Sequence, residues 1–235
     1  MTKDQPIAVV AGAGPGNGAA LARRFTDAGY AVALLSRHRA TLAPLAGELP
    51  DAHGYECDVG DPISVEATFA RIRNDLGEMD VLLYNAGSGV FGDIETITPD
   101  QFEQAWRVNA YGALLCSRQV IPGMKARGAG AIIFVGATAS RRGGIKSAAF
   151  APAKAAQRSL AESMARKLWP AGVHVALIVI DGVVDLPRSR AAMPDKAADE
   201  FVDPAGVAET AYQLCRQDRR AWSFEVEARP YTETW

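Results

Sequence analysis

The sequence predicts one α/β domain, in which helices cover both faces of a doubly wound parallel sheet of about seven strands. Strand and helix patterns alternate along residues 1–235 with short connections, and no linker, low-complexity tract or internal repeat divides them. Residues 173–180 contain almost no polar side chain, which is typical of a strand covered on both faces. A glycine-rich turn at residues 12–18 joins the first apolar strand to the first helix.

The first part of the chain predicts four strands separated by helices. Residues 7–10 form the first strand, and the helix after the glycine turn carries Leu21, Phe25 and Ala28 on one face before Gly29 ends it. Asp61 and Pro62 predict an N-cap and a first-turn proline for a later helix. The other expected elements are a helix around residues 41–49 and strands at 31–36, 53–57 and 80–84.

The second part continues the alternation. Thr98 and Gln101 predict a capping box that opens a long helix containing Asn109. Asp203 and Pro204 predict the cap of the last helix. The remaining expected elements are a strand at 131–135, an alanine-rich helix at 151–168, the strand at 173–180 and a last strand on which residues 222, 224, 226 and 228 alternate.

Composition narrows the class of protein. The formal net charge is −2 and no block of like charge occurs, so nothing favours binding to nucleic acid. No apolar run approaches the roughly 20 residues that span a bilayer, and the N-terminal residues lack the apolar core of a signal peptide. Cys57, Cys116 and Cys215 are widely spaced and have no metal-ligand spacing with histidine, so we expect reduced thiols, a cytoplasmic protein and no metal site.

The glycine-rich turn predicts a bound dinucleotide. Gly12, Gly16 and Gly18 lack the Cβ that prevents a tight turn and close approach to a phosphate. The helix that follows points free N–H groups and the positive end of its dipole at an anion. The alternative is a tight strand-to-helix turn without a ligand.

Polar residues follow the second and third strands, at the sheet edge where such folds bind ligands. Ser36 and Arg37 stand where a carboxylate would otherwise bind the ribose of NAD. Arg37 can instead pair with a 2′-phosphate, which favours NADP(H) and leaves NAD(H) possible, unless Arg37 is a solvated surface residue. Asp58 is a candidate partner of the adenine amine or a turn cap.

The order of these motifs resembles the short-chain dehydrogenase/reductase family over nearly the whole chain. The matching motifs are Gly12-x-x-x-Gly16-x-Gly18, Asp58-Val59, Asn85-Ala86-Gly87, Asn109 and Lys154. The resemblance implies a Rossmann fold, a nicotinamide cofactor, a small carbonyl or alcohol substrate, and a homodimer or homotetramer. The cofactor-binding residues expected on this basis are Gly12, Gly14, Gly16, Asn17, Gly18, Ser36, Arg37, Asp58, Val59, Asn85, Ala86, Gly87, Lys154, Gly182 and Val183.

The chain departs from the family at the proton donor. The family's Tyr-x-x-x-Lys pair becomes Phe150 and Lys154, and the serine position falls on Ala137. Asn109 and Lys154 fit the catalytic pattern, whereas Phe150 and Ala137 have nothing to ionise. Thr138 is the nearest candidate for a replacement hydroxyl, although a bond to local backbone is its ordinary role. Further candidates are Ser140, Ser147, Tyr84, Tyr111 and Lys154, for which a cofactor-binding role is favoured.

A second departure follows the sixth strand, where the family's Pro-Gly becomes Asp181-Gly182. Asp181 adds a carboxylate near the expected nicotinamide position, or serves as a turn residue. Residues 183–200 show no clear strand and are expected to cover the substrate, and Arg188 and Arg190 hint at an anionic substrate.

Two functions therefore stay open. The first is an NADP(H)-dependent oxidoreductase with a non-standard proton donor. The second is a catalytically silent NADP(H)-binding sensor or partner subunit.

Overall fold

The computed structural model describes residues 5–233 and confirms the expected fold class. Seven strands form one parallel sheet in the order β3-β2-β1-β4-β5-β6-β7. Their bounds are β1 Ile7–Ala11, β2 Ala31–Ser36, β3 Ala52–Glu56, β4 Val81–Tyr84, β5 Gly130–Ala137, β6 Val173–Ile180 and β7 Glu225–Ala228. The order reverses between β1 and β4, and this reversal places a crevice at the carboxyl ends of the central strands.

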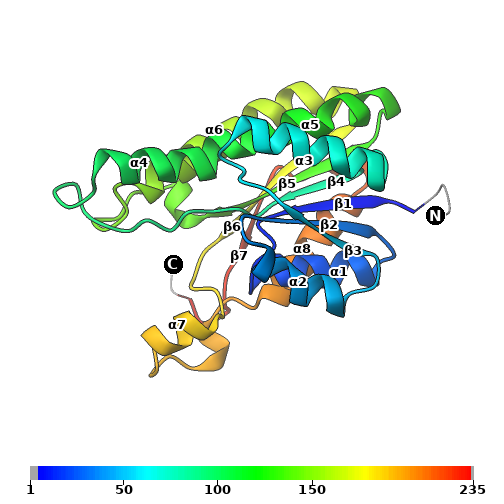
Figure 1. Ribbon diagram of the computed structural model, residues 1–235. Coiled ribbons are helices and arrows are strands. Elements are labelled where there is room, and N and C mark those ends of the chain that lie inside the picture. Colours follow the sequence, from blue (N-terminus) through cyan, green and yellow to red (C-terminus); the bar gives the residue numbers. More distant parts are fainter. Residues whose placement is uncertain (1–4, 234–235) are drawn as a thin grey trace.

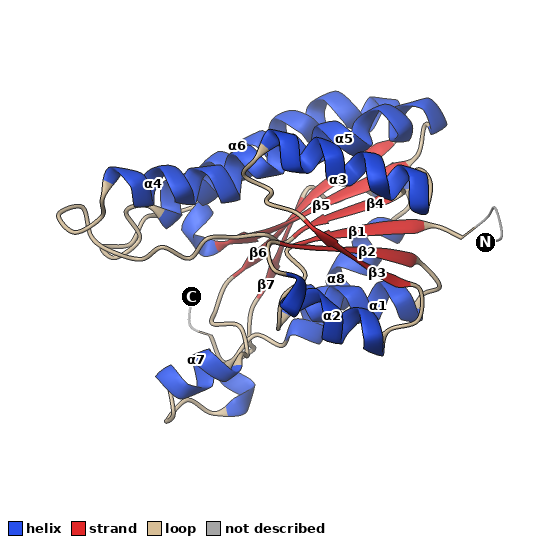
Figure 2. Ribbon diagram, viewed as in Figure 1, coloured by secondary structure: helices blue, strands red, loops and turns tan. Residues whose placement is uncertain are grey.

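Helices cover both faces of the sheet (Figures 1 and 2). One layer contains α3 (Pro62–Asp75), α4 (Pro99–Trp106), α5 (Gly112–Arg127) and α6 (Phe150–Leu168). The opposite layer contains α1 (Asn17–Asp27), α2 (Arg39–Glu48) and α8 (Pro204–Arg216), while the short α7 (Pro187–Ala192) projects beyond the sheet. None of the helices in residues 5–233 is long and apolar enough to cross a membrane.

The core lies in two layers because neighbouring residues of each buried strand face opposite sides of the sheet. In β1, Ile7 and Val9 pack into one layer while Ala8 and Val10 pack into the other. Every residue of β6 is buried, as its apolar sequence predicts. The sheet is therefore a rigid platform for the loops at its carboxyl edge.

The predicted helix caps are confirmed. The Asp61 carboxylate accepts hydrogen bonds from the backbone N–H groups of Ile63 and Ser64, each at 3.2 Å. Thr98 and Gln101 form the reciprocal capping box, with bonds of 3.2 and 3.0 Å. Asp203 caps α8 in the same manner as Asp61 caps α3. These contacts satisfy N–H groups that have no partner within their own helix.

Several element boundaries differ from the prediction. β3 ends at Glu56, before Cys57, and β5 continues past Val135 to Ala137. The long helix around Asn109 is interrupted by a π-helical turn, Arg107–Tyr111, between α4 and α5. The prediction of a strand from residue 222 was wrong, because the Trp222 ring stacks on His174 at 4.7 Å and β7 begins at Glu225. Residues 183–200 contain α7, which the sequence pattern did not indicate.

Candidate active site

A cavity of about 740 Å³ opens at the carboxyl ends of β1, β2, β4, β5 and β6. The structure brings together residues that the sequence predicted separately. Those that line the cavity are Gly12, Gly14, Asn17, Ser36, Arg37, Asp58, Val59, Asn85, Ala86, Gly87, Ala137, Phe150, Lys154, Gly182 and Val183. Gly16, Gly18, Asn109 and Thr138 do not line it.

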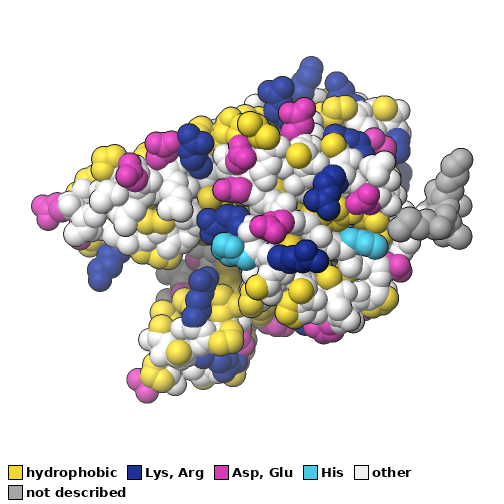
Figure 3. All heavy atoms as spheres, viewed as in Figure 1, with side chains coloured by type: hydrophobic (Ala, Val, Ile, Leu, Met, Phe, Trp, Pro, Cys, Tyr) yellow, Lys and Arg dark blue, Asp and Glu magenta, His cyan; other side chains and the backbone are white. Residues whose placement is uncertain are grey.

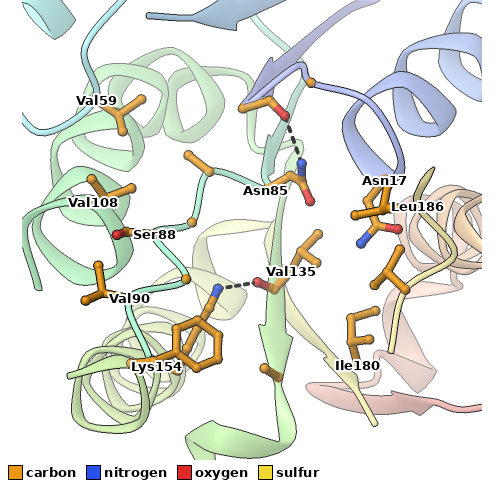
Figure 4. Close-up of a pocket in the computed structure, with 18 of the residues that line it drawn as sticks. Asn17, Val59, Asn85, Ser88, Val90, Val108, Val135, Lys154, Ile180 and Leu186 are labelled. Carbon is orange, nitrogen blue, oxygen red and sulfur yellow. Dashed lines mark hydrogen bonds between the residues drawn. The ribbon is translucent and has the colours of Figure 1, made fainter. Parts of the chain in front are cut away.

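The glycines of the turn have distinct roles. Gly12 has a φ of +90°, and a Cβ there would lie 2.6 Å from the backbone of Ala86. A Cβ on Gly18 would lie 2.3 Å from the carbonyl oxygen of Gly12, so Gly18 lets the turn fold against α1. The Asn85 amide donates to the same carbonyl at 2.8 Å (Figure 4). Glycine and asparagine therefore hold the ends of β1 and β4 together at the cavity floor.

Residues 183–200 contact the glycine turn. A Cβ on Gly16 would lie 2.3 Å from the Leu186 side chain, which sits directly above the turn. Figure 4 shows Leu186 and Asn17 side by side at the cavity wall. Arg188 lines the cavity, whereas Arg190 forms an ion pair with Asp185. The segment thus covers the turn with an apolar side chain and brings one arginine to the cavity.

The ends of β2 and β3 form the other side of the cavity. Arg37 is exposed, and within residues 5–233 it has no carboxylate partner. Asp58 accepts a hydrogen bond from the backbone N–H of Gly60 at 2.9 Å and also reaches the cavity. Asp58 therefore caps a turn and also stands at the cavity, where its carboxylate is open to the adenine amine of a cofactor.

A buried polar chain runs from Lys154 to the π turn. Lys154 Nζ donates to the Val135 carbonyl at 2.9 Å and to Gln157 Oε1 at 3.2 Å. Gln157 Nε2 donates to the Asn109 carbonyl at 3.0 Å. The Asn109 side-chain amide donates to the carbonyls of Ala105 and Ser88 at 2.8 and 3.2 Å. Burial lowers the pKa of the Lys154 ammonium to about 8.

Sequence reasoning missed Gln157. Its signal was a long polar side chain three residues after Lys154, on the buried face of an otherwise alanine-rich helix. The side chain is completely buried, so its amide needs partners on both ends. Lys154 and Asn109 supply them.

Phe150 and Ala137, which the resemblance aligns with the family's tyrosine and serine, both line the cavity. The Phe150 ring lies 5.2 Å from the Phe91 ring, and Lys154 Nζ lies 5.9 Å from the Phe150 ring centre. Two aromatic rings therefore line this part of the cavity, next to the Lys154 amine.

Thr138 turns away from the cavity. Its hydroxyl is bonded to the Asp181 carboxylate and lies 3.1 Å from the Ile180 carbonyl. A hydroxyl has one proton to donate, and the two acceptors near it belong to the last residue of β6 and the residue that follows it. Asp181 is buried and also pairs with Arg229, so its carboxylate joins the segments that follow β5, β6 and β7.

The two tyrosine candidates are also occupied. Tyr84 is fully buried and donates to the Val108 carbonyl, and burial raises the pKa of its hydroxyl well above the ordinary value. Tyr111 stacks on Trp106 with ring centres 5.5 Å apart. Neither tyrosine lines the cavity.

The cavity fits a dinucleotide. The glycine turn forms a cradle that side chains would fill, and α1 begins at its edge with Asn17, which lines the cavity. The side-chain oxygen of Asn17, the first residue of α1, is buried without a hydrogen-bond partner among residues 5–233. These features suit the phosphate and amide groups of a nicotinamide cofactor.

Comparison with known proteins agrees with this geometry. Residues 6–196 match the model of the short chain dehydrogenase family. The chain is 31% identical over 183 residues to the 3-oxoacyl-[acyl-carrier-protein] reductase MabA of Mycobacterium tuberculosis, which covers 78% of this chain and 71% of that protein. It is 30% identical over 216 residues to the D-xylose 1-dehydrogenase of Caulobacter vibrioides, and the match covers 90% of this chain and 81% of that protein.

Solved structures show the same similarity. A short-chain dehydrogenase from Rhodopseudomonas palustris superposes with a TM-score of 0.82 at 33% identity, covering 97% of this chain and 99% of that one. A metagenomic short-chain oxidoreductase in complex with NADP gives a TM-score of 0.82 at 27% identity, and the match covers 97% of this chain and 98% of that one. With a family model that matches most of its length and a cavity built from the family's motifs, this chain belongs to the short-chain dehydrogenase/reductase family.

Proposed function

We propose that the protein is an NADP(H)-dependent oxidoreductase that acts on a small carbonyl or alcohol substrate with a non-standard proton donor. When bound, the nicotinamide supplies a hydride to a carbonyl carbon or accepts one from an alcohol carbon. The observation that carries the proposal is Arg37, an exposed cation on the cavity wall with no carboxylate partner in residues 5–233. The family's metagenomic member bound to NADP supports the same cofactor class.

Each part of the cavity has a task in this proposal. Arg37 and Ser36 hold the 2′-phosphate, and the glycine turn with the start of α1 holds the pyrophosphate. Gly182 and Val183 hold the nicotinamide end from β6. Phe91 and Phe150 provide an apolar wall for the substrate, and the segment with Leu186 excludes water above the turn.

Cofactor choice tests the proposal. Arg37→Asp removes the cation and places a carboxylate beside the 2′-phosphate, so we expect NADPH affinity to fall by about 10- to 100-fold while NADH affinity is kept or improved. Calorimetric titration with both cofactors measures this. Arg39→Asp is the matched control, because Arg39 is a nearby exposed arginine that does not line the cavity. Unchanged NADPH affinity in Arg37→Asp would remove Arg37 from the phosphate site.

Turnover is the second part of the test. Wild-type protein is assayed with NADPH or NADP⁺ against a panel of aldehydes, ketones and alcohols. We expect measurable oxidation or reduction with at least one class. Cofactor binding without any turnover would instead support the alternative function, a catalytically silent NADP(H)-binding sensor or partner subunit.

A further inference from the structure

Lys154 is a buried amine, and no carboxylate in residues 5–233 pairs with it. Only 5% of the residue is exposed, yet it lines the cavity. Nζ is bonded to the carbonyl of Val135 and the amide of Gln157, and it lies 5.9 Å from the ring centre of Phe150. Nζ and the Asn109 side-chain oxygen both lie within 4 Å of the point that a Cβ on Gly87 would occupy. Within residues 5–233, no titratable or charged side chain of α6, the π turn, β5 or residues 85–91 acts on Lys154, and burial alone lowers its pKa.

The buried contacts determine how this amine is oriented. The Asn109 carbonyl can only accept a hydrogen bond, so Gln157 must turn its Nε2 toward Asn109 and its Oε1 toward Lys154. Two of the three positions around Nζ are then taken by the Val135 carbonyl and Gln157 Oε1. The third position has no hydrogen-bond partner among residues 5–233.

The third position has the same direction in both protonation states. An ammonium carries three N–H donors, so it presents one N–H there. A neutral amine keeps two N–H groups for the two buried acceptors, and its lone pair takes the third position. Because Lys154 lines the cavity and Figure 4 shows Nζ at the cavity wall bonded to Val135, this position can exchange a proton with a group in the cavity.

We propose that Lys154 Nζ is the proton source of the reaction and that Gln157 is the positioning residue that aims it. The inference rests on the proposed function. In carbonyl reduction the carbonyl carbon receives the hydride, and the π electron pair moves to oxygen. The oxygen takes the proton from Nζ, the N–H electron pair stays on nitrogen, and water returns a proton to the neutral amine afterwards. Alcohol oxidation reverses these steps.

The first test measures the amine without turnover. Protein labelled with ¹³Cε-lysine is titrated by NMR with and without NADP⁺, and the Lys154 resonance is assigned by its absence in Lys154→Met. Gln157→Leu removes an oxygen that stabilises the charged amine, so we expect the pKa of Lys154 to fall by about one pH unit. Gln157→Met, which keeps the side-chain length, is expected to do the same. Gln213→Leu, an exposed change of the same type on α8, leaves the Lys154 titration unchanged.

The second test asks whether this proton enters the reaction. Reduction needs the charged amine, so kcat/KM is lost as the pH rises through the pKa of Lys154, whereas oxidation gains rate over the same range. In Gln157→Leu and Gln157→Met, the fall of kcat/KM for reduction and its rise for oxidation (the two pH limbs) are both expected to move to lower pH by the shift measured by NMR. A purely structural role would lower kcat without moving the limbs.

The outcomes separate the two proposals. If the Lys154 titration shifts in both Gln157 variants but the pH dependence of turnover stays in place, Lys154 is not the proton source, and the oxidoreductase is left intact. A Lys154 titration that is the same in wild type and both variants overturns the role of Gln157. Absence of turnover in wild-type protein, with NADPH bound, overturns the oxidoreductase and the proton source together.

Discussion

Phe150 stands, by the resemblance, where the family carries tyrosine, and its ring has no hydroxyl. The ring packs against Phe91 and lies 5.9 Å from Lys154 Nζ, on the cavity wall beside the end of β5. Ala137, the last residue of β5, leaves the neighbouring serine position without a hydroxyl as well. A phenol placed here would lie close to an amine, which would favour its ionised form.

Restoring the two hydroxyls is expected to raise turnover. In the double variant Phe150→Tyr plus Ala137→Ser, a positioned acid replaces the slower proton path, so we expect kcat to rise by about 10²- to 10⁴-fold. Steady-state kinetics on the best substrate of the panel measure this, and Phe91→Tyr is a control that adds a phenol to the partner ring. A double variant that binds NADPH and is no faster than wild type would show that the original residues are not limiting.

At the scale of elements, His174 connects three parts of the fold. It lies in β6, its Nδ1 contacts the Leu214 carbonyl of α8 at 3.0 Å, and its Nε2 contacts the Ser223 carbonyl before β7 at 2.9 Å. Trp222 stacks on the ring, and Trp169 packs against its edge. Burial lowers the pKa of His174, with the two carbonyls opposing this effect.

This histidine is expected to make stability depend on pH. The folded chain holds the ring neutral below the ordinary value of about 6.5, so the unfolded chain binds more protons there. The stabilisation is therefore complete above that value and is lost as the pH falls through the lowered pKa of His174. Urea unfolding between pH 7 and pH 5 measures the slope, and His174→Gln should flatten it. The same slope in both proteins would assign it to other groups.

At the scale of the whole molecule, the predictable features are those that depend on neighbouring residues. Asp61 and Thr98 cap their helices because the N–H groups they bond lie two or three residues away. The apolar run of β6 is buried for the same local reason. The sequence predicted the cavity residues through motif order, since parallel strands bring their carboxyl ends to one edge.

The features that could not be predicted depend on contacts between distant segments. Gln157 bonds to Asn109 only because the π turn packs against α6. Thr138 bonds to Asp181, just after β6, rather than lining the cavity. Trp222 lies outside β7 and stacks on His174. The alternating pattern of residues 222–228 gives no sign of this contact, because His174 lies on another strand.

The surface of the upper helical layer predicts self-association. Phe102 and Trp106 of α4 are 45% and 43% exposed, and Figure 3 shows hydrophobic side chains among the charged ones over this layer. Exposed apolar groups on paired helices favour burial against a second copy, and the family resemblance implies a homodimer or homotetramer built through these helices. We therefore expect sedimentation to give twice or four times the chain mass of 25.0 kDa.

Charge placed on that surface should separate the subunits. Phe102→Glu puts a carboxylate where apolar contact is expected, and its burial without a partner is unfavourable, so the sedimenting mass should fall toward that of one chain. Ile63→Glu is the matched control, since Ile63 is 77% exposed on α3. Loss of assembly in the control alone would place the contact on α3. A wild-type mass equal to one chain at micromolar concentration would contradict the assembly itself, and Phe102 would then be an exposed residue of a monomer.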